Sequence, residues 1–173
     1  MPVLLIRFVH FVEAANYRLG RIMMYFIFVM MGILLWSSVS KTFFLPSLWT
    51  LELAQFAMMA YFILGGPYAM QLGANVRMDL LYGSWTVVQK AWVDTFTVAF
   101  LLIYLAVLLY GGIESLAYAL EFKERSSSAW RPYMWPIKML MCLGITLMLL
   151  QALCELIKDI ATIRDVDINM ADK

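Results

Sequence analysis

Charged residues are scarce in this chain. Only 14% of its 173 residues are Asp, Glu, Lys or Arg, whereas 64% are hydrophobic. A soluble domain of this size carries about a quarter charged residues, and it could not hide so much apolar surface from water. The net charge of +1 provides no basic field for nucleic acid, so no nucleic-acid partner is predicted. The composition therefore predicts a protein whose surface is solvated by the lipid bilayer.

Residues that bind metals and cofactors are also few. The chain has one histidine, His10, and two cysteines, Cys142 and Cys154. On one helix the two thiols would stand about 18 Å apart, too far for a disulfide, so we expect both to be buried small hydrophobic residues. No haem, metal or other cofactor site is predicted. The sequence also lacks a glycine-rich phosphate loop and a nucleophile motif, so we expect no catalytic residue and no enzyme.

Four apolar segments are each long enough to cross about 30 Å of hydrocarbon. Four such segments in so short a chain cannot all be buried core helices. The sequence therefore predicts an all-α membrane protein, a single membrane domain over residues 1–173, with transmembrane helices at 22–40, 50–72, 92–116 and 136–157. The run Gly65-Gly66-Pro67 predicts a bend in the second span, which we interpret as a static kink in preference to a hinge.

The first twenty residues show a different pattern. At about 100° per residue, a helix over residues 2–20 and its continuation gather Arg7, Arg18 and Arg21 on one stripe, with most apolar side chains off it. We expect an N-terminal amphipathic in-plane helix on the inner leaflet, its basic stripe toward anionic headgroups. The alternative is a cleaved signal peptide, but Trp36 and the long apolar run favour a retained anchor.

The distribution of basic residues predicts the orientation. Eight of the thirteen Lys and Arg residues lie in segments that would face one side of the membrane, and three of these precede the first span. Only Lys41 follows that span closely. Because positive loops stay on the cytoplasmic side, we expect a multi-pass protein with both termini in the cytoplasm.

Acidic residues are absent from the middle of every predicted span. Glu52, Asp94, Glu114 and Glu155 lie near span ends, where they can reach the interface. A proton-coupled transporter needs a titratable group on its transport path, normally near the midplane. This distribution favours a membrane scaffold over a catalyst or an independent carrier.

Two connecting loops are rich in polar and aromatic residues. The loop from Gln71 to Trp85 contains Arg77 and Asp79, and the loop from Glu121 to Lys138 mixes both charge signs with Trp130 and Trp135. Arginine and aromatic residues on a loop are typical of protein contacts, but they are equally typical of membrane interfaces.

Taken in order, these features resemble a known family, the DctQ-like small membrane subunit of tripartite ATP-independent periplasmic (TRAP) transporters. The resemblance covers about residues 20–160 and rests on the order of its motifs, which are individually degenerate. They are Glu52, the run Gly73-Ala74-Asn75-Val76-Arg77-Met78-Asp79-Leu80-Leu81, the run Gly111-Gly112-Ile113-Glu114-Ser115, the loop residues Glu124, Ser126 to Ser128, Trp130, Pro132, Trp135, Pro136 and Lys138, and Gly144. The family often carries a histidine before the Arg-x-Asp step, which this chain lacks.

The resemblance implies a non-catalytic small permease subunit of the bacterial inner membrane. Its partners would be a large TRAP membrane subunit, which holds the substrate and sodium sites, and a periplasmic substrate-binding protein. Together they would import an organic acid, such as sialic acid or a C4-dicarboxylate, by sodium symport. We expect this chain to scaffold the large subunit and to help dock the periplasmic protein.

Candidate site residues follow from the same resemblance and from the loops. Contact with the periplasmic protein is expected at Glu124, Arg125, Trp130, Arg131 and Trp135. Contact with the large subunit, or a structural role, is expected at Glu52, Gln55, Arg77, Asp79 and Glu114. The expected membrane-surface residues are Arg7, Arg18 and Arg21. Two other functions stay open, namely a stand-alone small membrane transporter or channel and a membrane anchor subunit of a redox enzyme.

Overall fold

Long helices account for most of the chain. The computed structural model describes residues 3–44, 47–73 and 87–163, in which the helices are α1 (Val3–Phe43), α2 (Thr50–Gln71), α4 (Val87–Glu121) and α5 (Trp135–Ile163). Each contains a stretch long and apolar enough to cross a membrane, so the prediction of an all-α protein with four candidate spans is confirmed. The span boundaries stay predictions, because a helix end and a membrane boundary are different quantities. Arg77 and Asp79 lie outside the described residues.

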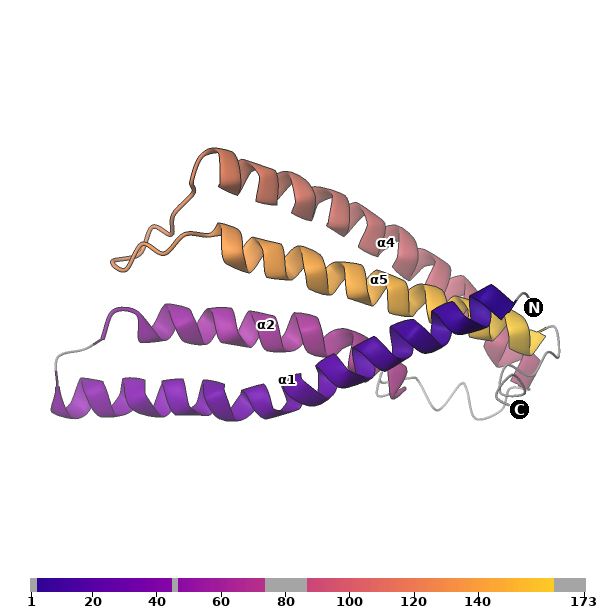
Figure 1. The fold of residues 1–173 in the computed structure, drawn as a ribbon, viewed down its shortest axis with the longest axis horizontal. Coiled ribbons are helices and arrows are strands. Elements are labelled where there is room, and N and C mark those ends of the chain that lie inside the picture. Colours follow the sequence, from indigo (N-terminus) through magenta and orange to yellow (C-terminus); the bar gives the residue numbers. More distant parts are fainter. Residues whose placement is uncertain (1–2, 45–46, 74–86, 164–173) are drawn as a thin grey trace.

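The helices form two hairpins, α1 with α2 and α4 with α5, which pack together mainly through α2 and α5 (Figure 1). We call the end where α1 begins and α5 ends the terminal end. The opposite end, which carries the loop at 122–134, is the loop end. The hairpins diverge toward the loop end (Figure 1). An apolar groove of about 350 Å³ lies between them there, lined by residues of α1, α2 and α5 that include Val29, Phe56 and Leu140.

Glycine permits a close approach between the hairpins. A Cβ atom added to Gly144 of α5 would lie only 2.0 Å from Cγ2 of Ile63 in α2. Because real atoms cannot approach so closely, Ile63 occupies the space that a side chain at position 144 would need. Next to this contact, Ile145 belongs to the buried core cluster, together with Met70 of α2 and Leu105 of α4. The two hairpins are therefore held together from Gly144 toward the terminal end.

Helix α1 is continuous over 41 residues, which corresponds to about 60 Å at 1.5 Å per residue. A separate amphipathic helix over residues 2–20 is therefore not shown. The physical reason is that nothing near residue 21 ends a helix: Gly20 costs only about 1 kcal/mol relative to alanine, and α1 contains no proline. Figure 1 shows α1 turning part-way along its length, so that its beginning crosses α5 while the remainder runs beside α2.

Proline does not end α2 either. Pro67 lies inside the helix with its side chain fully buried, and α2 continues to Gln71. The neighbouring Gly66 faces α5, because a Cβ atom added there would lie 3.6 Å from Sδ of Met148. This part of α2 therefore packs against the second hairpin. The bend at Gly65-Gly66-Pro67 stays a prediction.

Candidate functional site

Polar side chains of three helices meet inside the bundle at the terminal end. Asn16 of α1 donates a hydrogen bond from Nδ2 to Oε1 of Gln151 in α5 across 2.8 Å, and both residues are almost fully buried. Gln151 Nε2 donates in turn to Glu155 Oε1 at 3.2 Å. Gln71 of α2 donates from Nε2 to the backbone carbonyl of Glu13 at 3.3 Å. These bonds connect the beginning of α1 to α2 of its own hairpin and to α5 of the other.

A lysine adds charge to this network. Lys158 of α5 forms an ion pair with Glu13 of α1, and its Nζ lies 3.4 Å from Oε1 of Glu155. All three side chains are partly shielded from solvent, with exposed fractions of 20% for Glu13, 24% for Glu155 and 34% for Lys158. Shielding strengthens the attraction relative to water and also makes loss of one partner unfavourable. The ion pair therefore adds a second attachment between α1 and α5.

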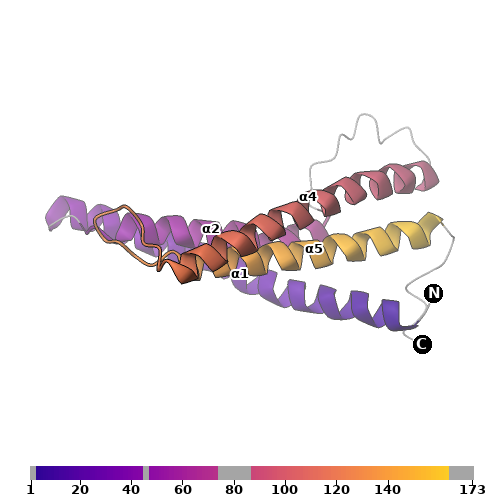
Figure 2. The same cartoon turned by 90° about the horizontal axis from the view of Figure 1, so that it is seen from above.

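Apolar side chains lie beside the same attachment. Val9 and Val12 of α1 are buried against Cys154 of α5, with Leu150 and Ile157 packed around them. Residues 9, 12, 13 and 16 of α1 thus share one face, with the valines and the polar groups both directed at α5. Figure 2 shows this part of α1 running alongside the end of α5. We call residues 3–20 of α1 the N-terminal segment.

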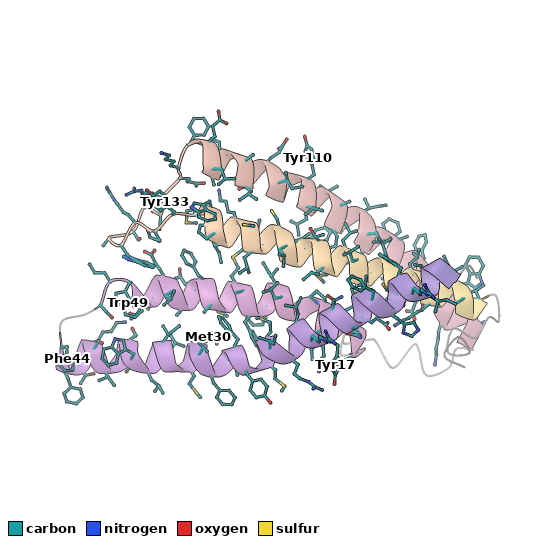
Figure 3. The ribbon with its side chains drawn as sticks, viewed as in Figure 1. Tyr17, Met30, Phe44, Trp49, Tyr110 and Tyr133 are labelled. Atoms are coloured by element: carbon teal, nitrogen blue, oxygen red, sulfur yellow. The ribbon has the colours of Figure 1, made fainter. Side chains whose placement is uncertain are left out.

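The basic stripe lies on the outside of the N-terminal segment and of the residue that follows it. Arg7, Arg18 and Arg21 are all exposed, as the sequence pattern predicted for one side of a helix. Arg21 donates a hydrogen bond to the hydroxyl of Tyr17 at 2.6 Å, and its guanidinium carbon lies 4.8 Å from the centre of the Tyr17 ring (Figure 3). Contact of these arginines with lipid headgroups stays a prediction.

The loop between α4 and α5 is folded back on itself at the loop end. Arg125 and Tyr133 form an isolated antiparallel bridge, and the amide of Ser126 donates to the carbonyl of Pro132 at 3.0 Å. The Arg125 guanidinium lies 4.3 Å from the centre of the Tyr133 ring and donates a hydrogen bond to the Tyr133 hydroxyl (Figure 3). Arg125, expected to contact a partner, is therefore engaged in shaping the loop.

Glu124 is likewise engaged within the chain. Its carboxylate forms an ion pair with Lys138 of α5, whose Nζ also donates to the backbone carbonyl of Ser115 in α4 at 3.4 Å. The lysine side chain is 17% exposed, so this pair lies at the edge of the packed region rather than in open solvent. It joins the loop, the end of α4 and the beginning of α5.

Other residues of the loop point outward. Trp130 is 43% exposed and Arg131 is exposed as well, and Trp135, the first residue of α5, is 41% exposed. Arg131 has a backbone φ of 50°, a left-handed conformation that is uncommon for residues other than glycine. Within the described residues its side chain has no hydrogen-bond or ion-pair partner. The loop thus presents Trp130 and Arg131, while Glu124 and Arg125 hold its shape.

The expected polar positions near the span ends lie apart from one another. Glu52 is partly buried in the first turn of α2, whereas Gln55, one turn later, is exposed. Glu114 is exposed on α4, in the other hairpin. Figure 3 shows Tyr110, one helical turn before Glu114, pointing away from the remaining helices. The structure does not gather these residues into one site.

Sequence reasoning missed the network at the terminal end. It assigned no role to Glu13, Asn16 or Gln151, because polar residues 135 positions apart give no local pattern that links them. The available signal was weak: Gln151 is an uncharged polar residue inside a long apolar run, where it needs a hydrogen-bond partner.

Comparison with known families identifies the chain. The family model for tripartite ATP-independent periplasmic transporters, DctQ component, matches residues 30–162. The chain belongs to the DctQ family. A DctQ component is a non-catalytic subunit of a TRAP transporter, so this chain is a multi-pass membrane protein whose partners are other TRAP components. The comparisons with curated proteins and with solved structures gave no match.

The DctQ match covers only part of the features described above. It includes α2, α4, the loop at 122–134 and nearly all of α5. The N-terminal segment, with Glu13 and Asn16, lies before the matched residues. The network at the terminal end therefore joins a region inside the family match to one outside it.

Proposed function

We propose that this DctQ component is the fixed scaffold of a sodium-driven TRAP system that imports an organic acid, such as sialic acid or a C4-dicarboxylate. Its large membrane partner holds the substrate and sodium sites and moves, while this chain restrains the fixed part of the assembly. The observation that carries the proposal is the exposed face of α4, where a carboxylate stands among apolar side chains inside a candidate span.

This face, the α4 surface, is made of exposed residues spaced three or four apart. They are Phe96, Phe100, Tyr104, Val107, Tyr110, Glu114 and Tyr118. Glu114 is close enough to the end of its span to reach the headgroups, but among apolar side chains a donor or cation on a neighbouring membrane protein stabilises its carboxylate further. The aromatic side chains add a large contact area. The α4 surface is therefore our candidate for contact with the large TRAP subunit.

The same proposal places the chain in the bacterial inner membrane. The terminal end faces the cytoplasm, in agreement with the basic residues around it, and the loop end faces the periplasm. The N-terminal segment lies along the inner leaflet and does not cross it. Two observations support this position: α1 is about twice as long as the hydrocarbon is thick, and its basic residues are exposed.

In this orientation the loop at 122–134 meets the periplasmic substrate-binding protein. Trp130 and Arg131 supply the contact, since both are exposed and both are residue types that carry much of the energy of protein interfaces. Glu124 and Arg125 contribute indirectly by keeping the loop folded.

The test is a charge reversal at Arg131 with a matched control on the same loop. Lys123 is also exposed, and its backbone φ of 48° resembles that of Arg131, so Lys123→Glu makes the same charge change in a similar setting. We expect Arg131→Glu to reduce substrate uptake by the assembled transporter about tenfold, the effect of a lost interface ion pair. Lys123→Glu should leave uptake close to wild type.

The amount of assembled membrane complex must be measured in parallel. Docking at this loop predicts normal assembly in both variants and a weaker affinity for the periplasmic protein in Arg131→Glu alone. Equal uptake by the wild type and Arg131→Glu would remove the loop from the docking surface.

A further inference from the structure

A second groove lies between α1 and α2, directly after the N-terminal segment of α1. Its volume is about 320 Å³, and its walls are mostly apolar, with Met24 and Phe62 among the lining residues. Gly65 keeps it open, whereas the Tyr68 ring packs directly over Gly20 at its edge. A Cβ atom added to Gly65 would have no neighbour within 4 Å, so the groove extends directly over this position.

A cation and two phenols stand at the rim of this groove. Tyr68 lines the groove, and its ring packs edge-on against the Tyr17 ring at 5.7 Å between centroids. Tyr17 is the side chain that Arg21 covers, and it accepts a hydrogen bond from Arg21. Arg21 directly follows the groove-lining Gly20 in α1, and its guanidinium is linked to the groove through Tyr17, whose ring contacts the groove-lining Tyr68.

We propose that this groove binds one phospholipid with an anionic headgroup, its phosphate held by Arg21 and Tyr17 and an acyl chain lying between α1 and α2. A guanidinium binds phosphate oxygens in a two-pronged arrangement, and tyrosine suits the headgroup level of a membrane. The part of α2 that lines the groove, from Tyr61 to Ala69, is about 12 Å long. That length is close to the depth of about 15 Å that one leaflet offers to an acyl chain.

The shape and charge of the groove favour a lipid over a partner helix. An α-helix with its side chains is about 10 to 12 Å wide, whereas α1 and α2 are in contact here, with Tyr68 filling the space over Gly20. A flexible hydrocarbon chain fits the remaining space, and its phosphate complements the exposed Arg21. The site requires only that Arg21 lie at the level of a membrane surface, and it does not depend on contacts with the other TRAP components.

Two leucine substitutions form the central test. Gly65→Leu fills the groove from its floor, while Gly32→Leu places the same side chain on α1, where a Cβ atom also meets nothing within 4 Å, outside the groove. Both changes raise helix propensity equally, so they differ only in the space they occupy. Ala69→Leu, also in the groove, is the second filling variant in case Gly65→Leu does not fold.

The full-length chain, purified in detergent, is titrated with phosphatidylglycerol or with phosphatidylcholine of the same acyl chains, and bound lipid is counted by native mass spectrometry. We expect phosphatidylglycerol to bind the wild type and Gly32→Leu with equal affinity, and to bind Gly65→Leu about tenfold more weakly. Arg21→Gln should lose about fivefold in its preference for phosphatidylglycerol, the effect of one basic residue at an anionic surface.

The contrary outcomes are equally specific. Undiminished phosphatidylglycerol binding by both groove-filling variants would overturn the site, and so would equal binding of the two lipids by the wild type. If Gly65→Leu instead lost the large TRAP subunit during purification while its lipid binding stayed normal, the groove would belong to a protein partner. Failure of loop docking leaves this titration unchanged, because no other TRAP component is present in it.

Discussion

Asn16 and Gln151 form a hydrogen bond of 2.8 Å within the bundle, although 135 positions separate them in the chain. Gln151 is 0% exposed and Asn16 is 2% exposed, so neither amide can turn to solvent if its partner is removed. This pair gives the N-terminal segment a defined position on α5, which apolar contacts alone do not specify.

Replacement of Gln151 should therefore destabilise the chain. Gln151→Leu leaves the buried Asn16 amide without its acceptor, and we expect a loss of about 1 to 3 kcal/mol in the free energy of unfolding. Gln55→Leu is the matched control, because Gln55 is exposed and should change stability in the isolated chain by about 0.5 kcal/mol at most. Denaturant unfolding in detergent measures both.

A double variant separates the hydrogen bond from packing. Asn16→Leu combined with Gln151→Leu removes both polar groups, and we expect it to be more stable than the sum of the single variants implies. Additive losses would mean that the two amides contribute independently.

The ion pair at Lys158 should control access to Cys154. Cys154 is 0% exposed beneath Val9 and Val12, so thiol labelling reports whether the N-terminal segment stays in place. In a Cys142→Ser background, Lys158→Met leaves Glu13 and Glu155 without their cation, and we expect maleimide labelling about fivefold faster, because a half-buried pair contributes about 1 kcal/mol. Lys41→Met, at the exposed far end of α1, should label at the wild-type rate. A wild-type labelling rate for Lys158→Met would show that the ion pair does not hold the N-terminal segment against α5.

The contact between the hairpins should tolerate no side chain at position 144. Gly144→Ala places a methyl group against Ile63, and we expect overpacking to cost about 1 to 3 kcal/mol in unfolding. Gly111→Ala, at an exposed position on α4 where an added Cβ meets nothing within 4 Å, should be neutral or slightly stabilising. Partial recovery by Ile63→Ala in the Gly144→Ala background would show that the clash is the cause. Equal stability of the two alanine variants would refute it.

Charge reversal on the α4 surface should weaken assembly of the transporter. We expect Glu114→Lys to lower the yield of co-purified large subunit about fivefold or more, since it replaces an attractive contact by a repulsive one. Glu121→Lys, exposed at the end of α4, is the control. Unfolding of the isolated chain should be unaffected in both variants. Normal yields of the large subunit with Glu114→Lys would exclude the α4 surface as its contact.

Most of the architecture follows from apolar composition. Four long hydrophobic runs predicted four helices, and the structure has them, because backbone groups in lipid must be hydrogen-bonded within each segment. The pattern at residues 2–20 predicted exposed basic residues, which the structure has, and a separate helix, which is not shown because α1 runs on without a break. The spacing of polar and apolar residues indicates which residues share a face of a helix. It does not show where the helix ends when no helix-ending residue such as proline is present.

The candidate site was less predictable for a physical reason. Glu124 and Arg125 look available in the sequence, but the folded loop brings Glu124 to Lys138 and Arg125 to Tyr133. Such pairings depend on how the backbone turns between residues 8 to 14 positions apart, which local patterns do not encode. The network around Gln151 depends on contacts of even longer range.

The contacts of Lys138 determine which helices would move together with a protein bound at the loop. Its ammonium group touches both the loop, at Glu124, and α4, at Ser115, so these described contacts tie the loop to the second hairpin. A protein resting on that loop would follow the tilt of α4 and α5 and would be insensitive to the tilt of α1 and α2. Distances measured from spin labels on the loop to each hairpin would then vary for one pair of helices and stay constant for the other.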